Sequence, residues 1–364
     1  MSELSSQFIT YQELRSGNYH VGNDKFGIAS YMTQIRKDAL LSCPNNIDDS
    51  KTAMLLLKDE DVVVGRTMLF GTKVKMDDKI FYAQSGSALE VEKQYRSQGA
   101  GAELILYSLR NKEYDFKVSA GFTSMVLPLY RKIKYEIFEL PQYIKVSKSR
   151  CVVNSYTKKP IIGKFVSFIG DFIIRILDIR NRLCLHKLNK NYSVKKIAVI
   201  PEWVQDIVLN DGHKYQELHD VDWFQWNLDH HFNDNPHNVQ NFYAVYDKDN
   251  EPQGFFMTKE RFVKDAGRYS NLVRGTVVEW GIKNGCPLKE KDLYLLSLPT
   301  FSSDVDIIVV ATDDKNTANK IWKAGFLRHG SFQIIFKDKK KQYPESNNQL
   351  FWRLRCGYCD SIMS

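Results

Sequence analysis

The chain has 364 residues, of which 43% are hydrophobic and 13% aromatic, and its formal net charge is +8. Such a length exceeds the usual size of one domain and allows substantial buried cores, so two domains are expected. Lysines and arginines alternate with acidic residues along most of the sequence, which dilutes any basic face and argues against a nucleic-acid partner. The lysine-rich run Lys337–Lys341 is interpreted as a solvated loop.

The N-terminal segment lacks the charged start and the apolar stretch of about 7–15 residues that a signal peptide needs. Six cysteines are scattered through the sequence, which fits a reduced compartment better than a disulfide framework. A cytoplasmic location is therefore expected. Cys356 and Cys359 form a C-x-x-C pair, but a zinc site would need a second pair, so no metal is expected.

The first half of the chain begins with a strand, turn and strand pattern. Pro44 precedes an apolar run at 52–57, an acidic turn at 58–61 and a second apolar run at 62–70. Paired runs of this kind are typical of neighbouring sheet strands.

A glycine-rich turn then joins a strand to a helix within Ala88–Leu109. Apolar and charged residues alternate before the glycines, whereas Ala102, Ile105 and Leu109 recur at helical spacing after them. The first backbone N–H groups of such a helix lack partners, and the missing Cβ atoms let an anion approach. The helix N-terminus adds about half a positive charge and Arg96 a full one, so the turn predicts a pyrophosphate site.

This turn has two other interpretations. It could serve only the close packing of strand and helix. A dinucleotide-binding fold is disfavoured because no acidic partner follows at the expected place.

Two segments resemble the GNAT superfamily of N-acyltransferases. Arg96–Gly101 follows a strand and opens a helix, as in the family's R/Q-x-x-G-x-G/A acyl-CoA signature, and Leu129–Tyr135 resembles its later helix signature. Lys134 departs from the usual glycine. The resemblance covers residues 1–147 and implies an acetyl-CoA or other acyl-CoA donor. It implies that the donor contacts the following residues: Leu89, Val91, Arg96, Gln98, Gly99, Ala100, Gly101 and Ala102.

The same resemblance implies direct attack of an amine on the thioester. Tyr130 stands where the family places the acid that protonates the leaving thiol, and a core tyrosine is the alternative interpretation. Glu90 is the candidate for deprotonating the amine, with Glu92 as a substitute, although a solvated strand glutamate explains it equally well. The strand Val118–Met125 is expected beside the donor, with Phe122 and Thr123 lining the opposite wall of the cleft.

An amphipathic helix is predicted between the halves, over 158–190. An apolar stripe contains Ile162, Phe165, Phe168, Ile169, Phe172, Ile173 and Ile176, and an opposite stripe contains Lys164, Asp171, Arg175, Asp178 and Arg182. The charged stripe excludes a membrane-spanning helix. Packing of the apolar stripe against the domains is favoured, and a peripheral membrane contact through 160–182 is the alternative.

The second half repeats the first with an offset of about 191 residues. Pro236 and Phe326 correspond to Pro44 and Tyr135, but Pro287 and Ile321 occupy the positions of Arg96 and Tyr130. We therefore expect a degenerate copy that binds rather than catalyses. The segment Asp229–His237 is interpreted as a polar helix end rather than a metal site.

The sequence thus predicts an α/β protein with two tandem GNAT-like domains, each a mixed, mostly antiparallel sheet flanked by helices. Residues 1–150 form the catalytic domain, 158–190 the linker helix and 191–364 the degenerate domain. The expected activity is transfer of an acyl group, acetyl in the first instance, to a primary amine of a small molecule, amino sugar, peptide or lipid-linked acceptor. A peptidyltransferase that uses aminoacyl-tRNA and a non-catalytic acyl-CoA-binding protein are the alternatives.

Overall fold

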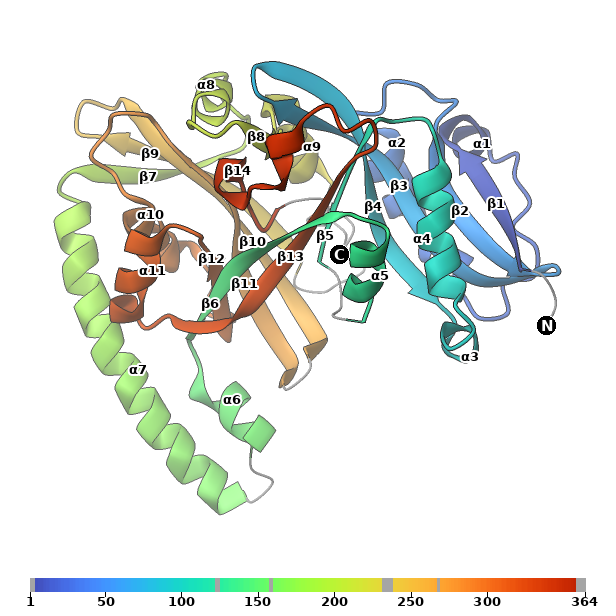
Figure 1. Ribbon diagram of the computed structural model, residues 1–364. Helices are drawn as coiled ribbons and strands as arrows, with labels where there is room; N and C mark the ends of the chain where they lie inside the picture. Colours follow the sequence, from blue (N-terminus) through green and yellow to red (C-terminus); the bar gives the residue numbers. More distant parts are fainter. Residues whose placement is uncertain (1–3, 122–124, 157–159, 231–237, 267–268, 358–364) are drawn as a thin grey trace.

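The computed structural model describes residues 4–121, 125–156, 160–230, 238–266 and 269–357, which form a mixed α/β molecule (Figure 1). The elements up to the long helix are β1 Leu4–Thr10, α1 Tyr11–Ser16, η1 Ala29–Tyr31, α2 Gln34–Leu41, β2 Thr52–Asp59, β3 Val62–Met76, β4 Lys79–Val91, α3 Lys93–Arg96, α4 Ala100–Arg110, β5 Phe116–Ala120, α5 Leu127–Lys132, β6 Glu136–Val146, α6 Ser149–Tyr156 and α7 Pro160–Leu188.

The remaining elements belong to the second half of the chain. They are β7 Tyr192–Ile197, α8 Trp203–Leu209, β8 Tyr215–Glu217, α9 Val221–Asp229, β9 Val239–Asp247, β10 Pro252–Ala266, β11 Tyr269–Ile282, α10 Glu290–Ser297, η2 Leu298–Thr300, β12 Ile307–Ala311, α11 Lys315–Ile321, η3 Trp322–Ala324, β13 Leu327–Asp338, η4 Pro344–Asn347, η5 Gln349–Phe351 and β14 Trp352–Arg353.

The strands of the two halves join into one sheet. Its order is β1-β2-β3-β4-β5-β13-β6-β12-β11-β10-β9-β7, and most neighbours are antiparallel. Parallel pairing recurs at the same place in each half, between β4 and β5 and between β11 and β12. A mixed, mostly antiparallel sheet flanked by helices is thus confirmed, and the repeat of its strand pattern agrees with the internal similarity of the sequence.

The halves exchange strands at the centre of this sheet. β13, near the C-terminus, lies between β5 and β6, whereas β6 pairs on its other side with β12. Phe116 of β5 and Phe336 of β13 stack with ring centroids 6.0 Å apart, so one hydrophobic core extends across both halves. The boundaries at 150 and 191 stay a prediction, because β13 belongs to the second half of the sequence but lies between two strands of the first half.

The lysine-rich run contributes to the same junction. Lys337 lies in β13 and donates a hydrogen bond of 3.1 Å to the carbonyl of Ile133, and Lys340 forms an ion pair of 2.7 Å with Asp115. Lys339 donates to the carbonyl of Asn111. The interpretation of this run as a solvated loop is thus correct only in part: Lys340 and Lys341 are exposed after the end of β13, but three of the lysines bind groups of the first half.

The apolar stripe of α7 faces away from the protein. Phe168 is 71% exposed and Phe172 60%, whereas Asn181, on the other side of the helix, is buried and donates a hydrogen bond of 3.1 Å to the carbonyl of Ala324. Gly170 approaches α6 so closely that a Cβ atom would lie 2.7 Å from the Cβ of Ser149. The favoured expectation that the stripe packs against the domains is therefore wrong: the helix packs on the protein through the side that carries Gly170 and Asn181, with Leu185 and Leu188 against the core of the second half.

The charges of α7 agree with this orientation. Asp178 forms an ion pair of 2.9 Å with Lys145, and Asp171 accepts a hydrogen bond from the backbone N–H of Ser149. Among the described residues no helix combines the length and the apolar character that crossing a bilayer requires.

Candidate functional site

A wedge opens in the sheet where β4 and β5 stop pairing. The two strands are in parallel register only from Ala83 to Ser85, and the backbone N–H of Gly86 then donates to the hydroxyl of Ser119 at 2.8 Å. The pairing of β4 with β3 is irregular at the same level, because β4 has one more residue than β3 there. Ala88, with a φ of 50°, lies in this bulge. This bulge turns the backbone of β4 away from β5.

A pocket of about 320 Å³ occupies the wedge. Its wall is formed by β4, β5, α4 and α5, together with Tyr31 from the opposite side of the sheet and Ile335 from β13. The lining residues are Tyr31, Thr67, Gln84, Gly86, Ser87, Ala88, Leu89, Leu104, Ile105, Ser108, Lys117, Ser119, Ala120, Gly121, Val126, Tyr130, Tyr135 and Ile335. The pocket therefore connects the α4 face of the sheet with the face that carries Tyr31.

The glycine-rich turn lies at the start of α4, whose residues Leu104 and Ile105 line this pocket. Gly99 is the N-cap of α4 with a φ of 87°, a left-handed conformation that favours glycine, and a Cβ atom added there would have no neighbour within 4 Å. Ala100 is buried against the sheet, and a Cβ atom added at Gly101 would lie 3.8 Å from a methyl group of Val91. The N–H groups of Ala102 and Glu103 donate to the carbonyl of Gly99, so those of Ala100 and Gly101 are the ones in this first turn that could bind an anionic group.

The side chains of the turn contribute less directly. Arg96, at the end of α3, donates a hydrogen bond of 2.8 Å from Nε to the carbonyl of Val91, which links the turn to the end of β4. Gln98 is exposed and donates to the carbonyl of Gln94, and Ala102 donates its backbone N–H to the carbonyl of Gly99. Of the predicted contact residues Leu89 lies in the pocket wall, and the others lie between the end of β4 and the first turn of α4 without lining the pocket.

Tyr130 lines the pocket and is 6% exposed. Its ring meets that of Tyr135 edge to face, with centroids 5.1 Å apart, and both rings belong to a small core with Ile105 and Ile335. Burial raises the pKa of the Tyr130 phenol, so the phenol is protonated at neutral pH and is a weaker acid than an exposed tyrosine. Lys134, which departs from the glycine of the family signature, adopts a left-handed φ of 60°, a conformation that favours glycine.

Glu90 lies on the opposite face of β4. Its carboxylate forms an ion pair of 2.7 Å with Arg66, which is buried, and Glu90 does not line the pocket. The guanidinium groups of Arg66 and Arg36 stack on Tyr31 at 3.9 Å and 3.8 Å from the ring centre. Glu90 therefore belongs to a charged cluster next to Tyr31. Its role as a base stays a prediction.

Lys117 is a pocket residue that the sequence analysis missed. It is 4% exposed, and its ammonium group donates to the amide oxygen of Gln84 at 2.5 Å and to the hydroxyl of Ser108 at 3.1 Å. Burial, with repulsion from Lys339, lowers the pKa of Lys117 to about 6. A lysine alternating with Phe116 and Val118 in a short apolar strand was the only signal in the sequence that could have indicated it.

Replacing Lys117 by methionine should flatten the pH dependence of stability. In the folded state Lys117 is neutral above about pH 6, whereas in the unfolded chain it stays charged up to its ordinary pKa near 10.4. Between these values the unfolded state binds one more proton, so the free energy of unfolding of the wild type increases as pH rises. The difference between wild type and Lys117→Met should change by about 1.4 kcal/mol per pH unit within that interval. Urea unfolding at several pH values measures it.

Ser108→Ala is the matched control, because it removes a partner of Lys117 without removing a titratable group. Its stability difference from wild type should vary much less with pH. A constant difference for Lys117→Met across the interval would contradict the lowered pKa.

The second half lacks the corresponding groups. Ile321, at the position that matches Tyr130, is buried in the core of that half, and α10 begins after Lys289 without the glycine-rich turn. Phe122, Thr123 and the segment from His231 to His237 lie outside the described residues, as does Cys359. Among the described residues no group of three or more histidine, cysteine or acidic side chains is arranged for a metal ion.

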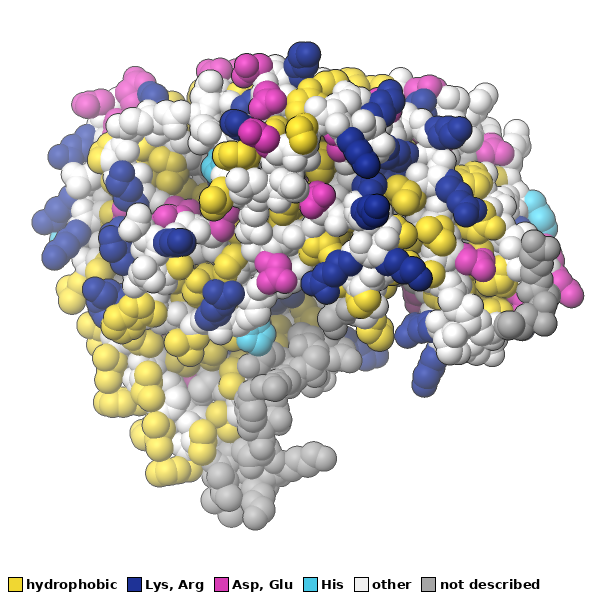
Figure 2. Space-filling model, viewed as in Figure 1, with side chains coloured by type: hydrophobic (Ala, Val, Ile, Leu, Met, Phe, Trp, Pro, Cys, Tyr) yellow, Lys and Arg dark blue, Asp and Glu magenta, His cyan; other side chains and the backbone are white. Residues whose placement is uncertain are grey.

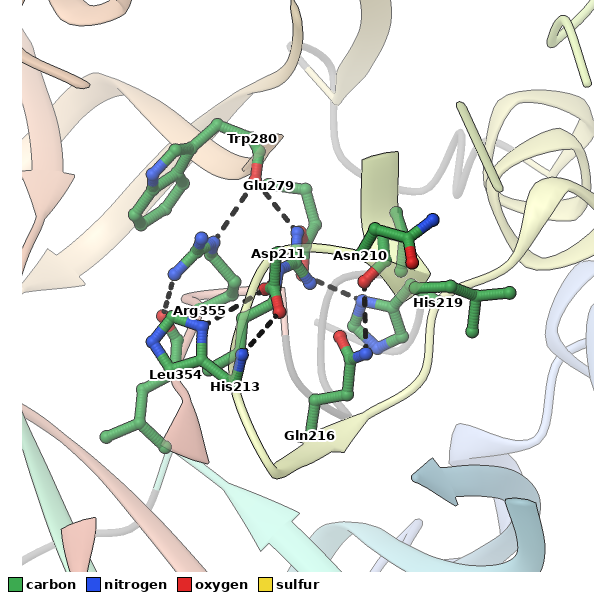
Figure 3. Close-up of polar contacts among 12 residues, drawn as sticks. Asn210, Asp211, His213, Gln216, His219, Glu279, Trp280, Leu354 and Arg355 are labelled. Carbon is green, nitrogen blue, oxygen red and sulfur yellow. Dashed lines mark hydrogen bonds and ion pairs between the residues drawn. The ribbon is translucent and has the colours of Figure 1, made fainter. Parts of the chain in front are cut away.

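A buried polar cluster joins the halves at another place (Figure 3). The carboxylate of Glu279 contacts Nδ1 of His219 at 2.8 Å and the guanidinium of Arg353 at 3.0 Å, and Arg353 also forms an ion pair of 2.8 Å with Asp211. Although burial opposes its charge, the carboxylates of Glu279 and Glu217 raise the pKa of His219. Glu217 lies in β8, which pairs with β3, and accepts a hydrogen bond from Thr72. We interpret the cluster as a structural link between the halves.

Several solved structures share this fold. N-myristoyltransferase from Saccharomyces cerevisiae with bound myristoyl-CoA is 11% identical, with a TM-score of 0.56 over 93% of this chain and 79% of that one. A probable N-acyltransferase from Enterococcus faecalis V583 is 12% identical, with a TM-score of 0.52 over 94% of this chain and 74% of that one. A GCN5-related N-acetyltransferase from Anabaena variabilis is 11% identical, with a TM-score of 0.53 over 93% and 73% of the two chains.

No protein-family model matches the sequence, and no curated protein is similar to it at a significant level. At identities of 10–12% the structural likeness shows the fold alone. Each of these comparisons extends over more than nine-tenths of this chain, so it includes both halves. The chain therefore has the tandem GNAT-like fold that is also found in N-myristoyltransferase.

Proposed function

We propose that this protein is an acyl-CoA-dependent N-acyltransferase whose donor site is the wedge between β4 and β5. The observation that carries the proposal is the position of the glycine-rich turn beside the wedge pocket, with Tyr130 in the pocket wall. A pyrophosphate at the start of α4 would allow the pantetheine arm to enter the pocket. The bound myristoyl-CoA of the yeast structure supports an acyl-CoA donor.

The proposed reaction needs no covalent intermediate with the protein. The amine attacks the thioester carbonyl, the carbon–sulfur bond breaks, and Tyr130 donates its proton to the departing sulfur. Backbone N–H groups at the unpaired edge of β4 near Val91 would bind the thioester oxygen as its charge develops. Tyr130 recovers its proton from solvent before the next cycle.

The acceptor amine would approach from the face that carries Tyr31. It must lose a proton before attack, and Glu90 is the carboxylate on that face at the end of the wedge, held by Arg66. A proton would pass from the ammonium group to Glu90, directly or through water. Glu92, immediately after β4, is the substitute.

The size and polarity of the pocket favour a short acyl group such as acetyl. A volume of about 320 Å³ is near the lower end of ligand pockets, and Gln84, Ser108 and Lys117 make part of its wall polar. A long fatty chain would enclose Nε2 of Gln84, a buried polar atom that has no hydrogen-bond partner among the described residues. We propose an amino sugar, an amino acid or peptide amine, or a lipid-linked amine as acceptor.

Coenzyme A should bind with a stoichiometry of one per chain and stabilise the fold. The first half has the glycine-rich turn and Tyr130, whereas Pro287 and Ile321 replace the matching residues in the second. Isothermal titration calorimetry with coenzyme A and with acetyl-CoA measures the stoichiometry, and a thermal scan measures the stabilisation. Two equivalent sites would contradict the degenerate second half. Absence of binding would remove the basis of the proposed function.

A further inference from the structure

Among the described residues, the largest group of exposed large hydrophobic side chains lies on α7. In the apolar stripe Phe165, Phe168, Ile169, Phe172, Ile173 and Ile176 are each between 44% and 71% exposed, and Ile179 and Leu183 continue it at 60% and 63%. At 100° per residue these eight side chains lie within about 140° of the helix circumference, so they form one continuous stripe. In Figure 2 hydrophobic side chains cover the part of the molecule where α7 projects from the sheet. Monomeric soluble proteins rarely leave such a patch uncovered.

The stripe is exposed although the opposite side of the helix packs against the protein. Gly170 packs on Ser149 of α6, Leu177 packs near Gly325, and Asn181 is buried. These contacts lie on the side of α7 opposite to the stripe, so burying the stripe by rotating the helix would break them. The stripe therefore needs a partner outside the described fold.

Basic side chains border the C-terminal half of the stripe. Arg175 and Arg182 follow one edge, whereas Arg180 and Lys187 lie toward the other, and all four are exposed. The two acidic residues of α7 are directed to the protein instead, Asp178 to Lys145 and Asp171 to the backbone of Ser149. The exposed border of the stripe is thus positive.

A basic pocket lies beside the same helix. It has a volume of about 180 Å³ and lies between α7, α10 and α11. Its lining includes Arg180, Lys320 and Lys323, and also Lys291, which forms an ion pair of 3.6 Å with Asp292. Trp322 is adjacent in sequence to Lys323 and is 58% exposed. Arginine and lysine around a small pocket suit a phosphate headgroup, and exposed tryptophan is typical of residues at a membrane interface.

From these observations we propose that α7 lies on the surface of an anionic lipid bilayer, with its apolar stripe in the acyl-chain boundary and the pocket of Arg180, Lys320 and Lys323 on a lipid phosphate. The charge of the border selects this partner over a second copy of the chain. A symmetric dimer through the stripe would bring the same basic edges together, whereas anionic headgroups complement them. The proposal concerns location and does not depend on the acyl-transfer activity.

Vesicle co-sedimentation of the full chain tests the apolar part. The wild type should bind vesicles of phosphatidylcholine mixed with phosphatidylglycerol, bind phosphatidylcholine alone more weakly, and dissociate as salt increases. Phe168→Ser combined with Phe172→Ser should reduce the vesicle partition coefficient about 100-fold. Its melting temperature should equal that of wild type, because both side chains are exposed. Val199→Ser combined with Leu350→Ser is the matched control, since these residues are 77% and 83% exposed elsewhere.

The basic pocket is tested by Arg180→Gln, Lys320→Gln and Lys323→Gln together. This variant should lose most of the preference for phosphatidylglycerol, on the order of 100-fold for three charges near the surface. Lys79→Gln, Lys196→Gln and Lys248→Gln, which are exposed lysines away from α7, make the same change in net charge and should bind as wild type does.

Three outcomes would overturn the proposal. The first is a wild-type protein that binds neither kind of vesicle, or phenylalanine variants that bind as wild type does. The second is a concentration-dependent dimer in analytical ultracentrifugation that Phe168→Ser with Phe172→Ser abolishes, because it assigns the stripe to a second copy. The third is binding of inorganic phosphate to the pocket without any effect of its three substitutions on vesicle binding. Acetyl-CoA titration of the same variants reports separately on the proposed function.

Discussion

Replacing Tyr130 by phenylalanine should lower turnover roughly 10²–10⁴-fold, the range expected when a positioned general acid is lost. The substitution keeps the ring that packs against Tyr135 and Ile105 and removes only the hydroxyl. Stability should change by about 1 kcal/mol or less, and coenzyme A affinity should stay the same. Single-turnover transfer from acetyl-CoA to a panel of amines, measured alongside coenzyme A binding, gives both quantities.

Tyr135→Phe is the matched control for this experiment. Tyr135 is buried, lines the same pocket and contacts the ring of Tyr130, so loss of its hydroxyl has a similar effect on packing. It should keep turnover near that of wild type. Equal turnover for Tyr130→Phe and wild type would reduce Tyr130 to a core residue. Failure of every amine to react with the wild type would favour a non-catalytic acyl-CoA-binding protein.

Replacing Gly99 by valine should weaken coenzyme A binding by about 3 kcal/mol, on the order of 100-fold, because a branched side chain would occupy the space beside the first N–H groups of α4. That space is open in the structure, since a Cβ atom at Gly99 has no neighbour within 4 Å. Calorimetric titration with coenzyme A measures the loss.

The left-handed conformation of Gly99 adds a strain that must be separated from the loss of binding. Gly285, with a φ of 80°, has an equally open Cβ position and lies before α10 in the second half. Gly285→Val should therefore lower the melting temperature about as much as Gly99→Val and leave coenzyme A binding intact. If both variants bind coenzyme A as wild type does, the donor phosphates do not lie at the start of α4.

The sequence by itself determined the features that depend on neighbouring residues. The turn at Gly99, the helix after it and the position of Tyr130 follow from patterns within about ten residues, and the internal repeat follows from the order of such patterns. Local propensity and periodicity act over this range, so these features could be read before any tertiary contact was known. The mixed sheet flanked by helices was implied by the resemblance to the GNAT superfamily that these local patterns carry.

Tertiary structure decided the features that depend on distant partners. β13 pairs with β5 across more than 200 positions of the chain, Glu90 is held by Arg66 of the neighbouring strand, and Lys117 acquires its low pKa only where α4 and β4 enclose it. The stripe of α7 is the clearest case. Its spacing identifies an apolar face, but Gly170 and Asn181 decide which face packs, because close approach and a buried hydrogen bond fix the rotation of the helix. A helical pattern states which residues share a face, and only the surrounding surface determines whether that face is buried.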